Sequence, residues 1–151
     1  MKRMFLILTV LLFVVAMGAF AQITDSASLN LSGTVGDFVS INVTPEPAAT
    51  SLALSSGQAA QLQVATVTIS SNVSYDVDVN SANTFNFNSG SEDVPYSLYY
   101  DGTVVSSNGD VVESGSSANG ATRPVAVTYN AATTQSSGTY SDTVTFTISS
   151  N

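Results

Sequence analysis

The chain has 151 residues, no cysteine or histidine, and eleven acidic side chains against three basic ones, for a net charge of −8. Without His or Cys it lacks the usual base, thiolate or soft ligand of nucleophilic and zinc sites. The acidic excess argues against nucleic acid or anionic lipid as a partner, because both bind clustered Lys and Arg. We therefore predict neither an enzyme nor a nucleic-acid-binding protein.

The first 21 residues have the parts of an export signal. Two basic residues follow Met1, an apolar run occupies residues 5–17, and the small-x-small motif AFA ends at Ala21. The apolar run is shorter than the about 20 residues of a permanent membrane helix. We predict cleavage after Ala21, export through the periplasm to the cell surface or an extracellular fibre, and no integral membrane segment in the mature chain.

Residues 22–36 are predicted to form an N-terminal arm. Its apolar side chains fall at odd-numbered positions, and Gly33 is odd-numbered as well. The apolar residues are Ile23, Ala27, Leu29, Leu31 and Val35. In an extended chain these side chains all lie on one face, and Gly36 can serve as a hinge before the next strand. Such an arm suits an apolar groove. The pattern leaves open whether the groove belongs to the same domain or to the next molecule.

From residue 37 to residue 151 the sequence alternates Val, Thr, Ile, Tyr and Phe with polar residues, and no helical stripe interrupts it. Together with the arm, this pattern predicts strands at 28–35, 38–44, 51–54, 61–69, 74–80, 84–87, 95–100, 103–105, 110–112, 124–129 and 140–148. The small polar stretches 114–122 and 131–138 are predicted to be surface loops. Many short strands with frequent turns predict an all-β, immunoglobulin-like antiparallel two-sheet sandwich.

The inward parity of these strands predicts the core. It comprises Leu62, Val64, Val67, Ile69, Tyr75, Val77, Val79, Tyr96, Leu98, Val125, Val127, Tyr129, Val144, Phe146 and Ile148. The apolar phase of 61–69 changes near Ala65, which predicts a β-bulge.

The last predicted strand carries Val144, Phe146 and Ile148 on one face, after a structural corner at Tyr140. In immunoglobulin-like sandwiches a tyrosine at this corner bonds back to the chain, and a further strand normally follows. Here none follows, so we expect one sheet to lack its closing strand. Its open edge would then border an apolar groove that another segment covers.

The export signal, the segment LNLSGTV and the ending GTYSDTVTFTI resemble subunits of chaperone-usher pili, most closely the spore-coat-U-like or archaic branch. The resemblance implies a fimbrial subunit that a periplasmic chaperone holds, an outer-membrane usher receives, and donor-strand exchange polymerises. It implies donor-strand positions at the arm residues Ile23, Ala27, Leu29, Leu31 and Val35. It also implies that Val144, Phe146 and Ile148 form part of the acceptor groove.

Two readings of function remain open. The first is a pilin-like surface subunit that assembles with other copies of itself or related subunits. The second is a monomeric periplasmic or surface adhesin module whose loops 114–122 and 131–138 contact glycan or protein.

Asp76 and Asp78 are the best carboxylate pair for an enzyme, but alternation places both on the solvated face of a strand. No cofactor is predicted, and the acidic turns 92–93 and 108–113 lack the spacing of a calcium loop.

Overall fold

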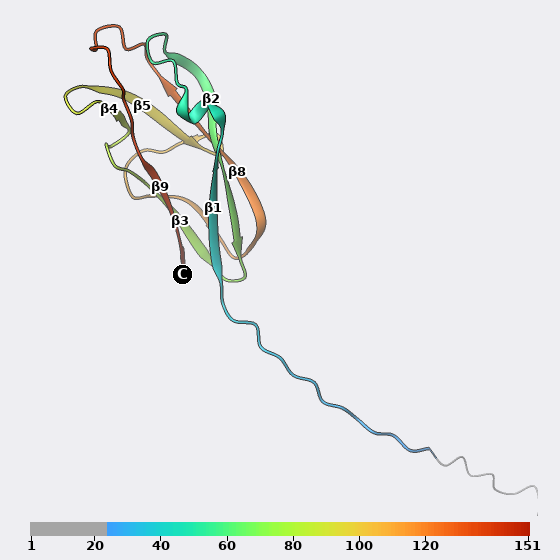
Figure 1. Ribbon diagram of the computed structural model, residues 1–151. Coiled ribbons are helices and arrows are strands. Elements are labelled where there is room, and N and C mark those ends of the chain that lie inside the picture. The colour runs from blue at the N-terminus through green and yellow to red at the C-terminus, as the bar shows by residue number, and fades with distance from the viewer. Residues whose placement is uncertain (1–23) are drawn as a thin grey trace, which may run out of the picture. The chain divides into compact units, whose positions relative to one another are not determined.

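The computed structural model describes residues 24–151, so the predicted export signal and Ile23 lie outside it. The described residues form an all-β sandwich of two antiparallel sheets, which confirms the predicted all-β, two-sheet class (Figure 1). Its elements are β1 (Val39–Pro45), η1 (Pro47–Thr50, a short 3-10 helix), β2 (Gln58–Ser71), β3 (Tyr75–Ser81), β4 (Asn86–Asn88), β5 (Asp93–Tyr100), β6 (Thr103–Val104), β7 (Asp110–Gly115), β8 (Ala118–Tyr129) and β9 (Val144–Ser150).

The larger sheet has the strand order β1-β2-β8-β5-β4, with β6 paired to β5, and the smaller sheet has the order β7-β3-β9. The long strands β2 and β8 form the centre of the larger sheet. A short connection after Ser71 carries the chain from β2 into β3, at the end of the sandwich where β1 begins and β9 ends. Residues 35–151 form one unit, and the chain up to Thr34 belongs to a separate one.

The core lies between the two sheets and follows the predicted parity. Val67, Ile69, Val77 and Val79 have no exposed surface. The other predicted core residues that are buried are Tyr75, Tyr96, Leu98, Val125, Val127 and Tyr129. The remaining predicted positions are only half-buried, and they are Leu62, Val64, Val144, Phe146 and Ile148. The predicted bulge is confirmed, because the register of β2 against β8 shifts between Gln63 and Ala65.

The prediction of a loop at 114–122 is wrong. Strand β7 continues to Gly115 and β8 begins at Ala118, so most of this polar stretch is paired backbone. Gly120 has φ of 65° where the β2–β8 register shifts, and its N–H donates to Ser70 Oγ at 3.1 Å. Ladder hydrogen bonds need no apolar side chain, and glycine takes the left-handed conformation of a bulge at little cost.

Four predicted strands also differ. The last one, 140–148, begins only at Val144, so residues 140–143 precede β9. Residues 28–35 are extended without a strand partner, and 51–54 form an irregular segment with a turn after η1. In 84–87 only the second half is paired, because Thr84 and Phe85 have φ of 56° and 59°. The left-handed region is unfavourable for β-branched and bulky residues, so propensity alone did not indicate this turn.

One side of the sandwich is closed by a polar cluster that joins the two sheets. Arg123 on β8 donates two hydrogen bonds to Glu113 on β7, at 2.9 and 2.8 Å, and the hydroxyls of Tyr75 and Tyr100 donate to the same carboxylate at 3.0 and 2.6 Å. Burial raises the pKa of the Glu113 carboxyl, but the hydrogen bonds from Tyr100, Arg123 and Tyr75 outweigh it and hold that pKa below its ordinary value. The only arginine of the described chain is thus part of the scaffold.

Candidate functional site: an open groove between β1 and β9

Strand β9 is an edge strand in the described part of the chain. It pairs with β3 from Ser150 to Val144 and with no other strand there. Asn151 N–H donates to Ser74 O at 3.0 Å and Ala82 N–H donates to Thr143 O at 2.9 Å, so odd-numbered residues direct their backbone groups toward β3. By alternation, Val144, Phe146 and Ile148 direct theirs toward the open edge.

Strand β1 is the facing edge of the larger sheet. Phe38 O accepts a hydrogen bond from Asn72 N–H at 3.3 Å, and Glu46 N–H donates to Val64 O at 2.8 Å, so even-numbered residues of this segment face β2. The odd-numbered residues therefore direct their N–H and C=O groups toward the opening, while their side chains point inward. They are Val39, Ile41 and Val43, with Pro45 contributing a carbonyl only.

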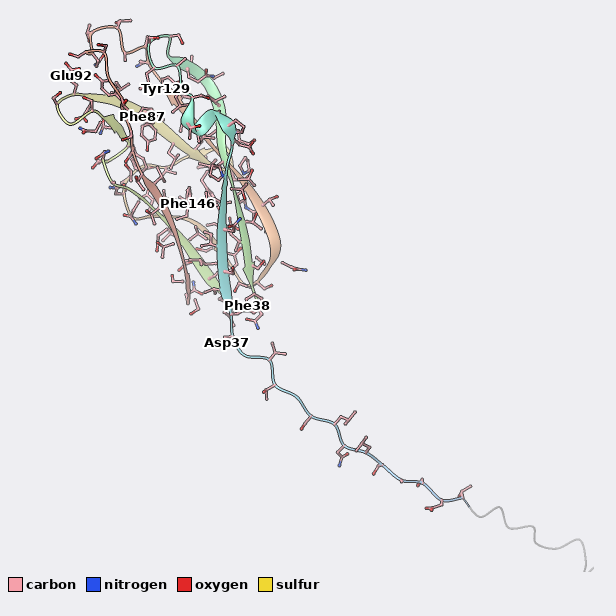
Figure 2. All side chains as sticks on the ribbon, in the orientation of Figure 1. Asp37, Phe38, Phe87, Glu92, Tyr129 and Phe146 are labelled. Atoms are coloured by element: carbon pink, nitrogen blue, oxygen red, sulfur yellow. The ribbon has the colours of Figure 1, made fainter. Side chains whose placement is uncertain are left out.

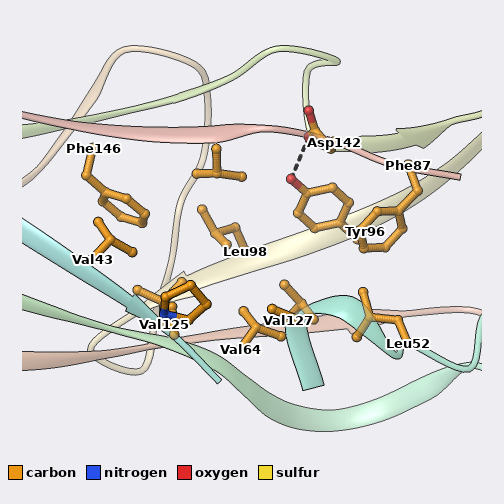
Figure 3. A pocket seen from close by; sticks show the side chains of 14 residues that line it. Val43, Leu52, Val64, Phe87, Tyr96, Leu98, Val125, Val127, Asp142 and Phe146 are labelled. Atoms are coloured by element: carbon orange, nitrogen blue, oxygen red, sulfur yellow. Dashed lines mark hydrogen bonds between the residues drawn. The ribbon is translucent and has the colours of Figure 1, made fainter. Parts of the chain in front are cut away.

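Between these two edges lies an apolar cavity of about 180 Å³ (Figure 3). β9 contributes Val144 and Phe146, whose side chains are half-buried, and no strand of the described chain pairs with this edge, although β1 approaches it to within 8 Å between Cα atoms. Residues from other elements line the rest: Val43, Pro45, Ala49, Leu52, Val64, Ala65, Phe87, Tyr96, Leu98, Val125, Val127 and Asp142. Sequence reasoning assigned only the β9 wall to the groove, because the other walls come from strands remote in sequence.

Asp142 forms a polar wall at one end of this groove. Its carboxylate accepts hydrogen bonds from the Tyr96 hydroxyl at 2.6 Å, shown dashed in Figure 3, and from the Ser81 hydroxyl at 2.5 Å. The backbone N–H of Asn83 adds a third at 3.0 Å. Burial, and secondly the bond to Asp142, raise the pKa of Tyr96, so the phenol stays protonated and remains a donor. The wall is therefore internally satisfied, and the groove beyond it is apolar.

The left-handed turn at Thr84 and Phe85 supports this end of the groove. Ser81 Oγ accepts a hydrogen bond from Phe85 N–H at 2.6 Å, and the Phe85 ring packs edge-on against Tyr96 with ring centroids 6.0 Å apart. The Phe87 ring stacks on Tyr96 at 4.4 Å. A turn of this kind costs on the order of 1–3 kcal/mol per strained residue, so surrounding contacts have to hold it in place.

Tyr140 fixes the corner that leads into β9. Its hydroxyl lies 2.7 Å from Glu92 Oε2 and 2.9 Å from the carbonyl of Ser136, so one proton is shared between two acceptors. Glu92 also accepts from Ser136 N–H at 2.6 Å. The Tyr140 hydroxyl first, and then Ser136, hold the pKa of Glu92 below its ordinary value. Glu92 was not predictable as the partner of Tyr140 from the sequence, because the two residues are 48 positions apart in the chain.

The arm residues are exposed. Leu29 is 81 % exposed, and Leu31 and Val35 are each 85 % exposed. Ala27 is exposed as well, and Ile23 lies outside the described residues. The structure thus brings Val144 and Phe146 together in the groove, with Ile148 on the same face of β9. The described arm positions that were predicted as donor residues are exposed.

No helix in residues 24–151 is long and apolar enough to cross a membrane. In the same residues, no three acidic side chains come together as metal ligands. No protein-family model matches the sequence, and no curated protein matches it.

Proposed function

We propose that the protein is an exported, pilin-like structural subunit whose groove between β1 and β9 binds the N-terminal arm of another copy. Repetition of this contact builds a chain of subunits at the cell surface, a fimbrium-like fibre. The observation that carries the proposal is a pair of unpaired strand edges on either side of an apolar cavity, in a protein with an exposed apolar arm. By the family resemblance, a periplasmic chaperone and an outer-membrane usher would be the secretion partners.

The arm has the chemistry that such a groove requires. An added strand can pair with the free backbone groups of one edge while one of its faces fills the cavity. It pairs with both edges only if β1 and β9, whose Cα atoms approach to within 8 Å, move apart to about two strand spacings. The arm alternates Ala27, Leu29, Leu31 and Val35 with Ser, Asn and Thr, which supplies one apolar and one polar face. Residues 27–35 form a longer segment than the seven residues of β9, so they can cover the whole edge.

Gly33 also fits this role. In the free arm, a Cβ at Gly33 would meet nothing within 4 Å, and its φ is not in the left-handed region. The free conformation therefore gives no reason for a glycine. In the bound arm its position lies on the inward face, where the absence of a side chain suits a narrow part of the groove.

The direction of insertion decides what assembles. β1 begins and β9 ends at the same end of the sandwich, and the arm joins the domain there. An arm that runs antiparallel to β9 enters at the opposite end, near η1, and gives an open head-to-tail chain. An arm that runs parallel to β9 enters the groove at the end of the sandwich where β1 begins. This arrangement gives a self-closed monomer or a reciprocal dimer. Each direction is antiparallel to one edge and parallel to the other, so pairing energy does not choose between them.

A charge-matched pair of variants tests the proposal. Leu29→Asp with Leu31→Asp places two charges on the inward face of the arm, and Asn30→Asp with Ser32→Asp places the same charges on the outward face. We expect the wild-type and outward variants to form oligomer ladders and fibres by size exclusion and electron microscopy, and the inward variant to stay monomeric. Equal behaviour of the two variants, or a wild-type protein that stays monomeric when exported from its native host, would overturn the proposal.

A monomeric binding module is the second candidate. A surface hollow of about 560 Å³ lies between residues 52–55 and the loop 131–138, and it favours this reading. Glycan-array binding by a monomer, lost on replacement of 131–138, would support the adhesin role. Unchanged binding after that replacement would exclude this loop as the binding site.

A further inference from the structure

We propose that the side chain of Asn72 directs the arm away from its own groove and so reserves that groove for a second copy. This inference rests on the proposed function, because it concerns which arm fills the site. Asn72 lies in the short connection between β2 and β3, next to the point where the backbone enters β1. Figure 2 labels Asp37 and Phe38 at this point.

The contacts form a clamp on residues 36–38. Asn72 Nδ2 donates to the carbonyl of Gly36 at 2.9 Å, and Asn72 Oδ1 accepts from Phe38 N–H at 2.8 Å. The backbone N–H of Asn72 adds a third bond, to Phe38 O, at 3.3 Å. The amide side chain therefore continues the β1–β2 ladder beyond its last residue pair, Val39 with Ser71, and holds Gly36 to Phe38 as an extension of β1.

A fold-back of the arm requires a turn at this place. The arm would have to reverse just before β1 and return along the open edge. If the turn between the arm and β1 had an even number of residues, Asn30, Ser32 and Thr34 would lie on the inward face. Only a turn with an odd number of residues brings Leu29 and Leu31 into the groove. The hinge glycine is the natural turn residue, but its carbonyl is held by Asn72 in the extended arrangement.

Chain connectivity gives such a device a role. An arm tethered to its own domain competes with arms of other molecules at an effective concentration of order millimolar. Without a bias at the hinge, self-closure would win over assembly at ordinary protein concentrations. Two hydrogen bonds shift such a competition by roughly 5- to 150-fold, which lowers by the same factor the subunit concentration at which assembly overtakes self-closure. Asn72 is thus a positioning residue for assembly.

The test uses the full mature chain with Asn72→Ala, which removes both side-chain bonds, and Asn72→Asp, which keeps the acceptor for Phe38 N–H and loses the donor to Gly36. Asn42→Ala is the matched control, because its amide bonds only Thr44 on the outer face of β1. The readouts are the monomer fraction by sedimentation velocity, the Tm of that monomer, and its capture of a labelled peptide of residues 23–36.

We expect Asn72→Ala to raise the monomer fraction several-fold. That monomer should melt at a higher temperature than the wild-type monomer and capture at least tenfold less peptide, because its groove is already filled. Adding Leu29→Asp and Leu31→Asp should abolish these gains. Asn72→Asp should be intermediate and Asn42→Ala should match wild type.

Two results separate failure of this inference from failure of the proposed function. If Asn72→Ala assembles like wild type, or its monomer melts lower and captures peptide normally, Asn72 has only a local structural role and the clamp idea is wrong. If the peptide binds to no variant, including the one with aspartates in the arm, the groove does not accept the arm and the proposed function fails as well. Should Asn72→Ala not fold, the same comparison is made with Asn72→Asp.

Discussion

Leu31→Ala is expected to weaken binding of the arm to the groove while leaving the stability of the monomer nearly unchanged. Leu31 is 85 % exposed in the free arm, so its truncation should change the free energy of unfolding of the monomer by no more than about 0.5 kcal/mol. In the groove the same side chain would be buried against the apolar cavity. Truncation of a buried leucine costs about 2–5 kcal/mol, and the lower half of that range suits a shallow, edge-lined site. A loss of 2–3 kcal/mol corresponds to roughly 30- to 150-fold weaker binding.

The assay measures fluorescence anisotropy of a labelled peptide of residues 23–36. The acceptor is the full chain carrying Leu29→Asp and Leu31→Asp, whose own arm is not expected to fill the groove. Peptides with wild-type sequence, Leu31→Ala and Asn30→Ala are compared, because Asn30 has the opposite parity. Asn30→Ala should bind within about threefold of wild type. Equal losses for the two alanine peptides would refute the reasoning, since parity would then not decide which side chains enter the groove.

Three further predictions concern the sandwich itself. Val144→Asp should abolish peptide capture, because it places a charge on the inward face of the open edge, whereas Thr145→Asp on the outward face should leave capture unchanged in the same assay. Glu113→Gln should flatten the acid dependence of stability. The pKa of Glu113 lies below its ordinary value of 4.5 in the folded state, so its contribution is complete above that value and is lost as pH falls through the folded pKa. Urea unfolding from pH 6 to pH 3 should show a steeper loss for wild type than for the variant, and parallel curves would contradict this. Gly57→Ala should lower the free energy of unfolding by at least about 1 kcal/mol, because Gly57 has φ of 69° and a Cβ there would lie 2.6 Å from a backbone nitrogen. An unchanged denaturation midpoint would show that the backbone relaxes.

Loss of the Tyr140 hydroxyl provides a separate check on the corner before β9. Tyr140→Phe removes the donor to Glu92 and to the Ser136 carbonyl, so we expect about 1 kcal/mol lower stability by urea unfolding. Glu92 retains the Ser136 N–H as a donor, which limits the loss. A loss no larger than measurement error would mean that the corner is held by packing alone.

Strand faces were readable from the sequence because alternation is a local property of an extended chain. The parity of Tyr75, Val77 and Val79 predicted their burial, and the phase change near Ala65 predicted the bulge in β2. The same rule placed Val144 and Phe146 on one face of the final strand. It did not show that they would line a cavity with residues from five other strands and from η1.

Strand lengths were predicted less well where backbone pairing replaced side-chain burial. The polar start of β8, from Ala118, forms a strand because β2 is long enough to pair with it, and no apolar alternation marks that pairing. The reverse holds for residues 28–35, which have strong alternation but no neighbouring strand in the described chain. A strand needs a partner as well as a pattern.

The sequence by itself determined the sandwich class, the inward residues of its strands and the apolar face of the arm, because each depends on the two-residue period. The tertiary structure alone decided which edge stays open, that Asp142 receives Tyr96, and that Asn72 holds the chain at Gly36. The contacts of Tyr96 with Asp142 and of Asn72 with Gly36 are single hydrogen bonds between residues far apart in the chain. Such bonds leave no periodic signal in the sequence, because one polar side chain looks the same whether it faces water or a distant backbone group.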